Sequence, residues 1–262
     1  MQTESKSESR RGGFPATRWS AIVAARSADP SERARALDVL TAAYWKPVYK
    51  YIRMRWGKST EDAQDLTQEF FARLVEKNLF DGFDPARARL RTFLRSCIDH
   101  VVANQDRGDQ RLKRGGGALH LSLDFPAADG ELKHLDPAVP PEMDVFFERE
   151  WARSVFAAGV ERLRVHLAAQ DKSVYFRIFE RYDLLDALPG GPEKRPTYQH
   201  LATELGLAET DVTNYLAFAR REFRRIVLDF LRETTASDEE FRREARSLLG
   251  ADPGPRGAPH ST

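Results

Sequence analysis

The chain has 262 residues, 41% of them hydrophobic, which is enough to build the cores of two domains of ordinary size. Its 41 Lys and Arg residues balance 40 Asp and Glu residues, so any affinity for nucleic acid must come from the separation of charges along the chain. The single Cys97 excludes an internal disulfide, and six scattered histidines show no metal-ligand spacing. No N-terminal apolar segment resembles a signal peptide or a membrane span. We therefore expect a cytoplasmic protein with no membrane insertion, no metal and no cofactor.

Residues 1–13 are polar and have too little apolar content to fold, so we expect a disordered arm. From Thr17 to Ile52 apolar residues recur at helical spacing, and Pro47 is expected to break or kink the long helix near its middle. Two further amphipathic stretches begin near Ser59 and near Asp84. The pattern predicts a first helical domain over residues 14–113.

Residues 114–141 mix glycine, proline and acids without a sustained period, which is typical of a linker. Within them LHLSLDF alternates like a strand, but a strand cannot stand alone, so it should pack onto a neighbour or stay mobile. Helical periodicity resumes in a second domain over 142–235, and 236–262 form a C-terminal extension. The expected fold class is all-α, with two small helical domains joined by a flexible linker.

A helix-turn-helix is predicted in the second domain by the spacing of Ala202, Gly206 and Val212. A small residue lets two helices cross closely, glycine supplies the turn, and valine fills the angle between the helices. The outward face of the second helix could then contact base edges and phosphates. The alternative is an ordinary helical hairpin with solvated arginines, but the density of arginines at the helix exit favours DNA binding.

Opposite charges are separated onto two consecutive helices of the first domain. Residues 61–69 contain four acids and no base, whereas residues 87–114 contain eight Lys or Arg and three Asp. A basic helix can neutralise phosphates, while an acidic helix suits a basic protein partner. Either two different partners bind here or both runs are merely solvated faces.

The segments DAQDLTQEFFARLVEK (residues 62–77) and FDPARARLRTFLRSCIDHVVANQDR (residues 83–107) resemble the second conserved region of extracytoplasmic-function sigma factors. This resemblance implies that the acidic helix docks on the clamp helices of the polymerase beta-prime subunit. It also implies that the basic helix and its loop open the minus-ten element by base flipping and stacking. The polymerase-binding residues would be Asp62, Asp65, Gln68, Glu69 and Arg73. The minus-ten residues would be Arg87, Arg89, Arg91, Arg95, His100, Asn104, Arg107 and Arg111.

The second domain resembles the fourth sigma region, which implies that its helix-turn-helix reads the minus-thirty-five element and that the beta flap is a further partner. The residues implied are Thr213, Asn214, Phe218, Arg220, Arg221 and Arg224. Many family members have Arg at the positions of Thr213, Tyr215 and Phe218. An anti-sigma factor is a further partner that such proteins can have, and the sequence leaves it open.

The expected function is therefore a transcription initiation factor that binds core RNA polymerase and promoter DNA and is not an enzyme. The alternative is a sigma-derived regulator that keeps the helix-turn-helix but has lost initiation activity. A nuclease built on Asp99, His100 and Asp106 is disfavoured, because no phosphate loop, metal cluster or nucleophile accompanies these residues. No catalytic residues are expected.

Overall fold

The computed structural model describes residues 21–25, 27, 29–76, 79–106, 121–133, 142–185 and 195–250. Every regular element within these ranges is helical, which confirms the all-α prediction. The expected arm over 1–13 lies outside the described residues, and so do two of the expected minus-ten residues, Arg107 and Arg111. Among the helices that are described, none combines the length and the apolar character that a membrane crossing requires.

The first part of the fold is built on α2 (Pro30–Trp56), which packs against α1 (Ala21–Ala25), α3 (Thr60–Glu76) and α4 (Leu90–Asp106). Asp29 caps α2 by accepting a hydrogen bond from the Ser31 amide at 2.8 Å, and Gly57 ends it in the left-handed conformation with φ of 60°. The prediction was that Pro47 breaks or kinks this helix, and the helix runs through Pro47 without a break. Pro47 and the next five residues are buried, and this packing offsets the backbone hydrogen bond that proline cannot make.

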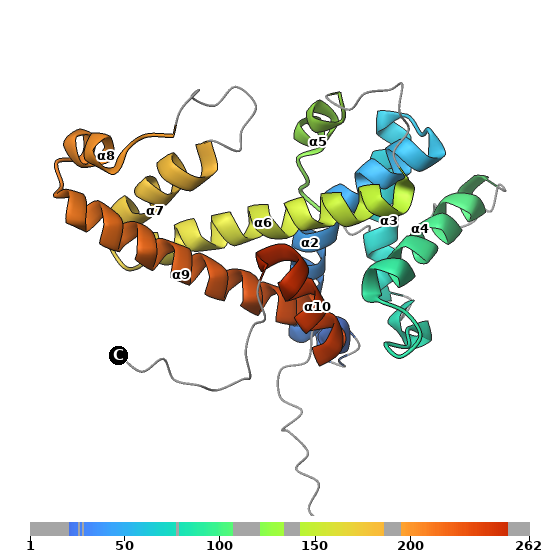
Figure 1. Ribbon diagram of the computed structural model, residues 1–262. Coiled ribbons are helices and arrows are strands. Elements are labelled where there is room, and N and C mark those ends of the chain that lie inside the picture. The colour runs from blue at the N-terminus through green and yellow to red at the C-terminus, as the bar shows by residue number, and fades with distance from the viewer. Residues whose placement is uncertain are drawn as a thin grey trace, which may run out of the picture.

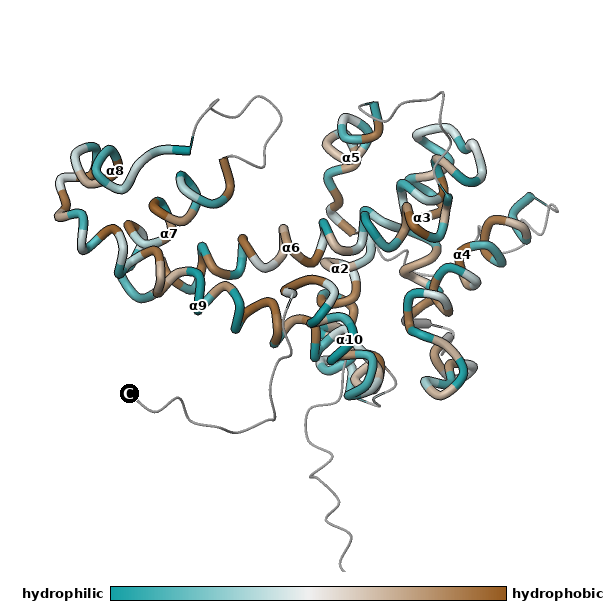
Figure 2. The backbone as a smooth tube through the Cα atoms, viewed as in Figure 1, coloured by the Kyte–Doolittle hydropathy of each residue, from teal (hydrophilic) through white to brown (hydrophobic). Residues whose placement is uncertain are grey.

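The two expected domains share the long helix α6 (Met143–Ala168). It packs against α2 and also against α9 (Glu209–Thr234), beside which it runs across the molecule (Figure 1). Gly159 lies at the α6–α9 contact, where an added Cβ would lie 2.7 Å from a Val227 methyl carbon. Hydrophilic and hydrophobic residues alternate along these helices, as expected for amphipathic elements (Figure 2).

The remaining elements extend both ends of this helix pair. At one end lie α7 (Ser173–Phe179), the π-helical turn Glu180–Leu184 and α8 (Tyr198–Leu205), which pack against α9 or against one another. At the other end α10 (Asp238–Leu249) folds back from the end of α9 (Figure 1). A short 3-10 turn at Leu79–Gly82 leads from α3 toward α4.

The prediction of a flexible linker over 114–141 is wrong for its central part, which is helical. Residues Phe125–Leu132 form α5. Asp124 caps this helix, because its side chain accepts a hydrogen bond from the Ala127 amide. The helix packs on α2: the Phe125 ring lies 5.7 Å from Trp45 and 5.0 Å from Tyr49. LHLSLDF is no strand in its described residues, 121–125, and leads directly into this helix.

Candidate nucleic-acid and protein interfaces

The acidic face of α3 points away from the core. Leu66, Phe70 and Leu74 are buried, as the helical spacing requires, and Asp62 and Asp65 on the other side are exposed. Glu69 pairs with Arg73 one turn later at 2.5 Å, and both side chains keep part of their surface in solvent. Four of the five expected polymerase-binding residues are therefore accessible to a partner.

Gln68, the fifth expected polymerase-binding residue, has a partner inside the chain. Its amide donates to the Leu121 carbonyl at 2.8 Å and accepts from the Leu121 amide at 3.0 Å. This pair of bonds holds the segment before α5 against α3. In this structure the Gln68 side chain binds the backbone of Leu121, and its expected contact with polymerase stays a prediction.

Asp129 of α5 completes this attachment. It accepts hydrogen bonds from Tyr49 at 2.8 Å and from Thr60 at 2.9 Å, and Arg53 lies 3.3 Å away. Burial would raise the pKa of the Asp129 carboxyl, but these donors and the Arg53 charge outweigh burial and lower it. Burial and the nearby Asp129 raise the pKa of Tyr49 to about 12.

The α4 region exposes only some of the expected minus-ten residues. Arg87, Arg89 and His100 are exposed, and Asn104 is half-buried. Arg95 is mostly covered and pairs with Asp144 of α6 at 2.7 Å. These residues lie on α4 and in the loop before it.

Arg91 corrects the prediction most clearly, because it is buried and cannot contact DNA in this structure. Its guanidinium is bidentate to Glu244 of α10, with both distances 2.9 Å, and lies 2.5 Å from Glu148 of α6. It also stacks over the Trp151 ring at 3.8 Å. Burial disfavours the charged guanidinium, but the carboxylates of Glu244 and Glu148 outweigh burial and raise the pKa of Arg91.

Sequence reasoning missed the carboxylates that meet the start of α4. Glu240 accepts a hydrogen bond from the Leu90 amide at 3.1 Å, and both Glu240 and Glu244 are buried. A signal was present: the two acids are four residues apart, on the same side as Phe241 and Ala245. This pattern places carboxylates on the buried side of an amphipathic helix, where each needs a partner.

The segment in which a helix-turn-helix was predicted contains the helices α8 and α9. Thr197 caps α8, and Gly206 ends it with φ of 67° and donates its amide hydrogen to the Ala202 carbonyl. Ala202 and Val212 are both buried, as their spacing requires. On the outer side of α9, Thr213, Asn214 and Arg221 are exposed.

The aromatic residues of α9 are partly used by the fold. Phe218 is half-buried beneath the Lys172 ammonium, which lies 4.4 Å from its ring, and Arg221 lies 5.2 Å from the same ring. Tyr215 stacks on Tyr175 of α7 at 4.0 Å. Two cations therefore flank Phe218 at the outer surface of this helix pair.

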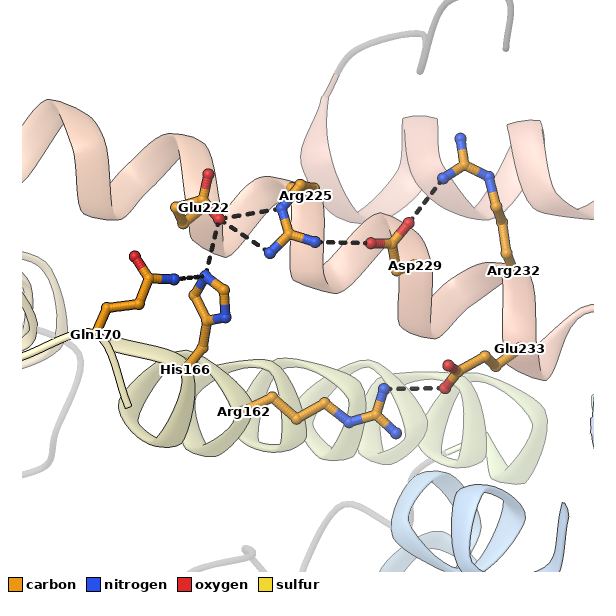
Figure 3. A network of polar contacts seen from close by, with 8 residues as sticks. All are labelled: Arg162, His166, Gln170, Glu222, Arg225, Asp229, Arg232 and Glu233. Carbon is orange, nitrogen blue, oxygen red and sulfur yellow. Dashed lines mark hydrogen bonds and ion pairs between the residues drawn. The ribbon is translucent and has the colours of Figure 1, made fainter. Parts of the chain in front are cut away.

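The arginines of α9 do not share one role. Arg220 is bidentate to Asp183 at 2.7 and 2.8 Å, so its expected phosphate contact is already taken by a carboxylate. Arg224 is half-buried. Further along, Arg225 bridges Glu222 and Asp229, and Glu222 also lies 3.2 Å from His166 of α6 (Figure 3). This later network joins α9 to α6. Arg221 takes no part in the contacts of Figure 3: it is exposed, and its guanidinium lies beside the Phe218 ring.

The described residues thus offer an acidic side on α3, two exposed arginines just before α4, and two helices, α8 and α9, joined by the turn at Gly206. Residues 41–112, from the second half of α2 past the end of α4, match the family model for sigma-70 region 2. The match covers 72 of the 262 residues and shows that this part of the chain is similar to sigma-70 region 2. No curated protein and no solved structure matches the chain.

Proposed function

We propose that the chain is a sigma factor of the extracytoplasmic-function type, which binds core RNA polymerase, directs it to promoters and assists DNA melting in the cytoplasm. The observation that carries this proposal is the match over residues 41–112 to sigma-70 region 2. The exposed acids of α3 lie within this match. As a sigma factor, the protein would guide a reaction that the polymerase catalyses, which agrees with the expectation that it is not an enzyme.

The proposed contact with polymerase is through α3. Asp62 and Asp65 are exposed, and Glu69 is partly so, which leaves negative charge on a side that contributes nothing to the core. Such a face steers a basic surface into contact and repels DNA. We propose that it binds the clamp helices of the beta-prime subunit.

The proposed contacts with promoter DNA come from both ends of the molecule. Near α4, Arg87, Arg89 and His100 are exposed and could meet the minus-ten strand. On α9, Asn214 and Thr213 could read base edges of the minus-thirty-five element, since Asn can pair with adenine through two hydrogen bonds. We propose that the second domain also meets the beta flap.

The test is the retention of core polymerase by an Asp65→Lys/Glu69→Lys variant. Reversing two charges on the proposed contact face should weaken binding by about tenfold or more, because like charges then meet across the interface. The matched control is Glu32→Lys/Asp38→Lys, which makes the same charge change at two exposed acids near the start of α2. Equal retention of both variants, with unchanged circular dichroism, would refute the proposed docking of α3.

A second function is favoured by two observations. The chain has Thr213 and Phe218 where many sigma factors have Arg, and it buries Arg91, which suits a regulator that has lost initiation activity. Run-off transcription with purified core polymerase and a genomic promoter library separates the two functions. Promoter-dependent transcripts are expected from the sigma factor, whereas DNA binding without transcripts would identify the regulator.

A further inference from the structure

The C-terminal helix α10 packs against the start of α4, although about 150 residues separate them in sequence. Ser237 caps the helix by accepting a hydrogen bond from the Glu240 amide. The apolar side of the helix is buried and includes Phe241 and Ala245. Glu240 and Glu244 lie on the same side and are only 7% and 3% exposed. The contact is therefore a buried, ionic attachment and not a loose tail.

The groups that α10 covers on α4 are those that bind anions. The Leu90 amide is the first of the helix, where backbone N–H groups have no intrahelical partner and favour negative charge, and it donates to Glu240. Next to it, the Arg91 guanidinium receives both carboxylate oxygens of Glu244. A bidentate guanidinium binds carboxylate and phosphate in the same geometry, so the two anions compete for it.

We propose that α10 is an autoinhibitory helix whose carboxylates take the place of DNA phosphates at the start of α4. This inference rests on the proposed function, in which the α4 region meets the minus-ten strand. While α10 is docked, Arg91 and the first amide of α4 are closed to DNA. Contact between DNA and Arg91 requires α10 to leave, and the phosphates then replace the two carboxylates, so that Arg91 keeps an anionic partner in both states.

The release of α10 has a chemical requirement that favours a polyanion. An arginine that loses its carboxylate inside the protein is strongly disfavoured unless another anion reaches it. Glu148 remains beside Arg91 after α10 leaves, at 2.5 Å in the closed structure, and this contact lowers the cost of opening. The closed and open forms can therefore exchange without leaving the guanidinium unpaired.

The test compares two variants of the full chain that lose the same charge from the same helix. The first variant, Glu240→Gln/Glu244→Gln, removes the two buried carboxylates that contact α4. The control, Asp238→Asn/Glu239→Gln, removes two exposed carboxylates from the first turn of α10. The probe is fluorescently labelled DNA with an unpaired bubble, and binding is followed by anisotropy over a range of salt concentrations. Hydrogen exchange of α10 amides reports the release of the helix.

The first variant should exchange faster in α10 and bind DNA about tenfold more tightly than the control, since the binding-competent form is then mostly populated. The slope of log affinity against log salt should steepen by about one unit, because Arg91 gains a phosphate. Equal affinities and equal slopes in the two variants would overturn the proposal, even if α10 exchanges faster. Should the double variant lose helicity, Glu244→Gln alone keeps the Glu240 bonds and must show a smaller change in the same direction.

Retention of core polymerase is measured on the same samples. It depends on α3 and should be equal in both variants, because neither alters that helix. Failure of the unsubstituted chain to bind polymerase would refute the proposed function but would leave the comparison between the two variants intact. The two ideas can thus fail separately.

Discussion

Gly159 shows how one residue sets the spacing of two helices. Its missing side chain lets α6 approach α9, where a Cβ would lie 2.7 Å from Val227 and 3.1 Å from Phe223. Val227 is 2% exposed and has little room to move. A glycine inside a helix lowers stability relative to alanine, and at this position the close packing of α6 on α9 offsets that loss.

Gly159→Ala should lower the free energy of unfolding by about 1–3 kcal/mol, because the overpacking outweighs the gain in helix propensity. Gly130→Ala in α5 is the matched control, since a Cβ there meets nothing within 4 Å. The control should be neutral or stabilising by up to about 1 kcal/mol. Urea denaturation followed by circular dichroism measures both, and a Gly159→Ala variant as stable as the control would contradict this account.

At the scale of elements, α5 is attached to α2 by charged groups. Glu131 accepts from Lys46 at 2.6 Å and from Lys50 at 2.5 Å, while Asp129 meets Tyr49, Thr60 and Arg53 as described above. Burial would raise the pKa of Glu131, but the two lysines outweigh it and lower it. Both carboxylates of α5 thus bind protons less readily when the helix is docked.

A carboxyl whose pKa is lowered on docking stabilises the docked form above its ordinary pKa of about 4, and this stabilisation is lost as the pH falls through the lowered value. We therefore expect α5 to become more accessible to hydrogen exchange as the pH falls below about 4. Asp129→Asn should flatten this pH dependence, and Asp124→Asn, at the cap of the same helix, serves as the control. An unchanged pH dependence in Asp129→Asn would mean that Asp129 does not hold the helix.

The elements also show which parts of the fold sequence reasoning could reach. Local spacing was sufficient for the inward side of α3 and for the turn at Gly206, because each depends on residues within one or two helical turns. It missed α5, although Asp124 followed by Phe125 and Pro126 is a helix start, because glycine and proline content suggested a linker. Local helix signals in such a segment deserve as much weight as its composition.

The candidate site was reached only where no distant partner intervenes. Asp65, His100 and Asn214 are exposed as expected, since periodicity decides which side of a helix faces away from its own core. Arg91 was expected to face outward for the same reason, but its partner Glu244 is 153 residues away. No pattern within α4 reports a helix that arrives from the other end of the chain.

For the whole molecule, the sharing of α6 means that the two expected domains are not independent units. Lys50 of α2 is 2% exposed in its side chain and lies 2.5 Å from Glu150 of α6, which is equally buried. Arg153, whose side chain is exposed, also forms an ion pair with Glu150, with 2.6 Å between the guanidinium nitrogen and the carboxylate oxygen. A buried pair of this kind fixes the position of α6 on α2, since neither charge can be left alone inside the protein.

We expect the chain to unfold in one cooperative transition, with circular dichroism and tryptophan fluorescence giving the same midpoint in urea. Lys50→Met should lower the free energy of unfolding by about 3–5 kcal/mol, because it leaves the buried Glu150 carboxylate with only the solvent-exposed Arg153 as a partner and also removes a partner of Glu131. Lys50→Met/Glu150→Leu should recover most of this loss, because the uncompensated charge is removed. Lys46→Met, at the neighbouring and partly exposed lysine, controls for the loss of a charge nearer the surface and should change stability by less than about 1 kcal/mol. Two separated transitions in the unsubstituted chain would show that α6 does not join the domains, and a double variant no more stable than Lys50→Met would show that packing, not charge, accounts for the loss.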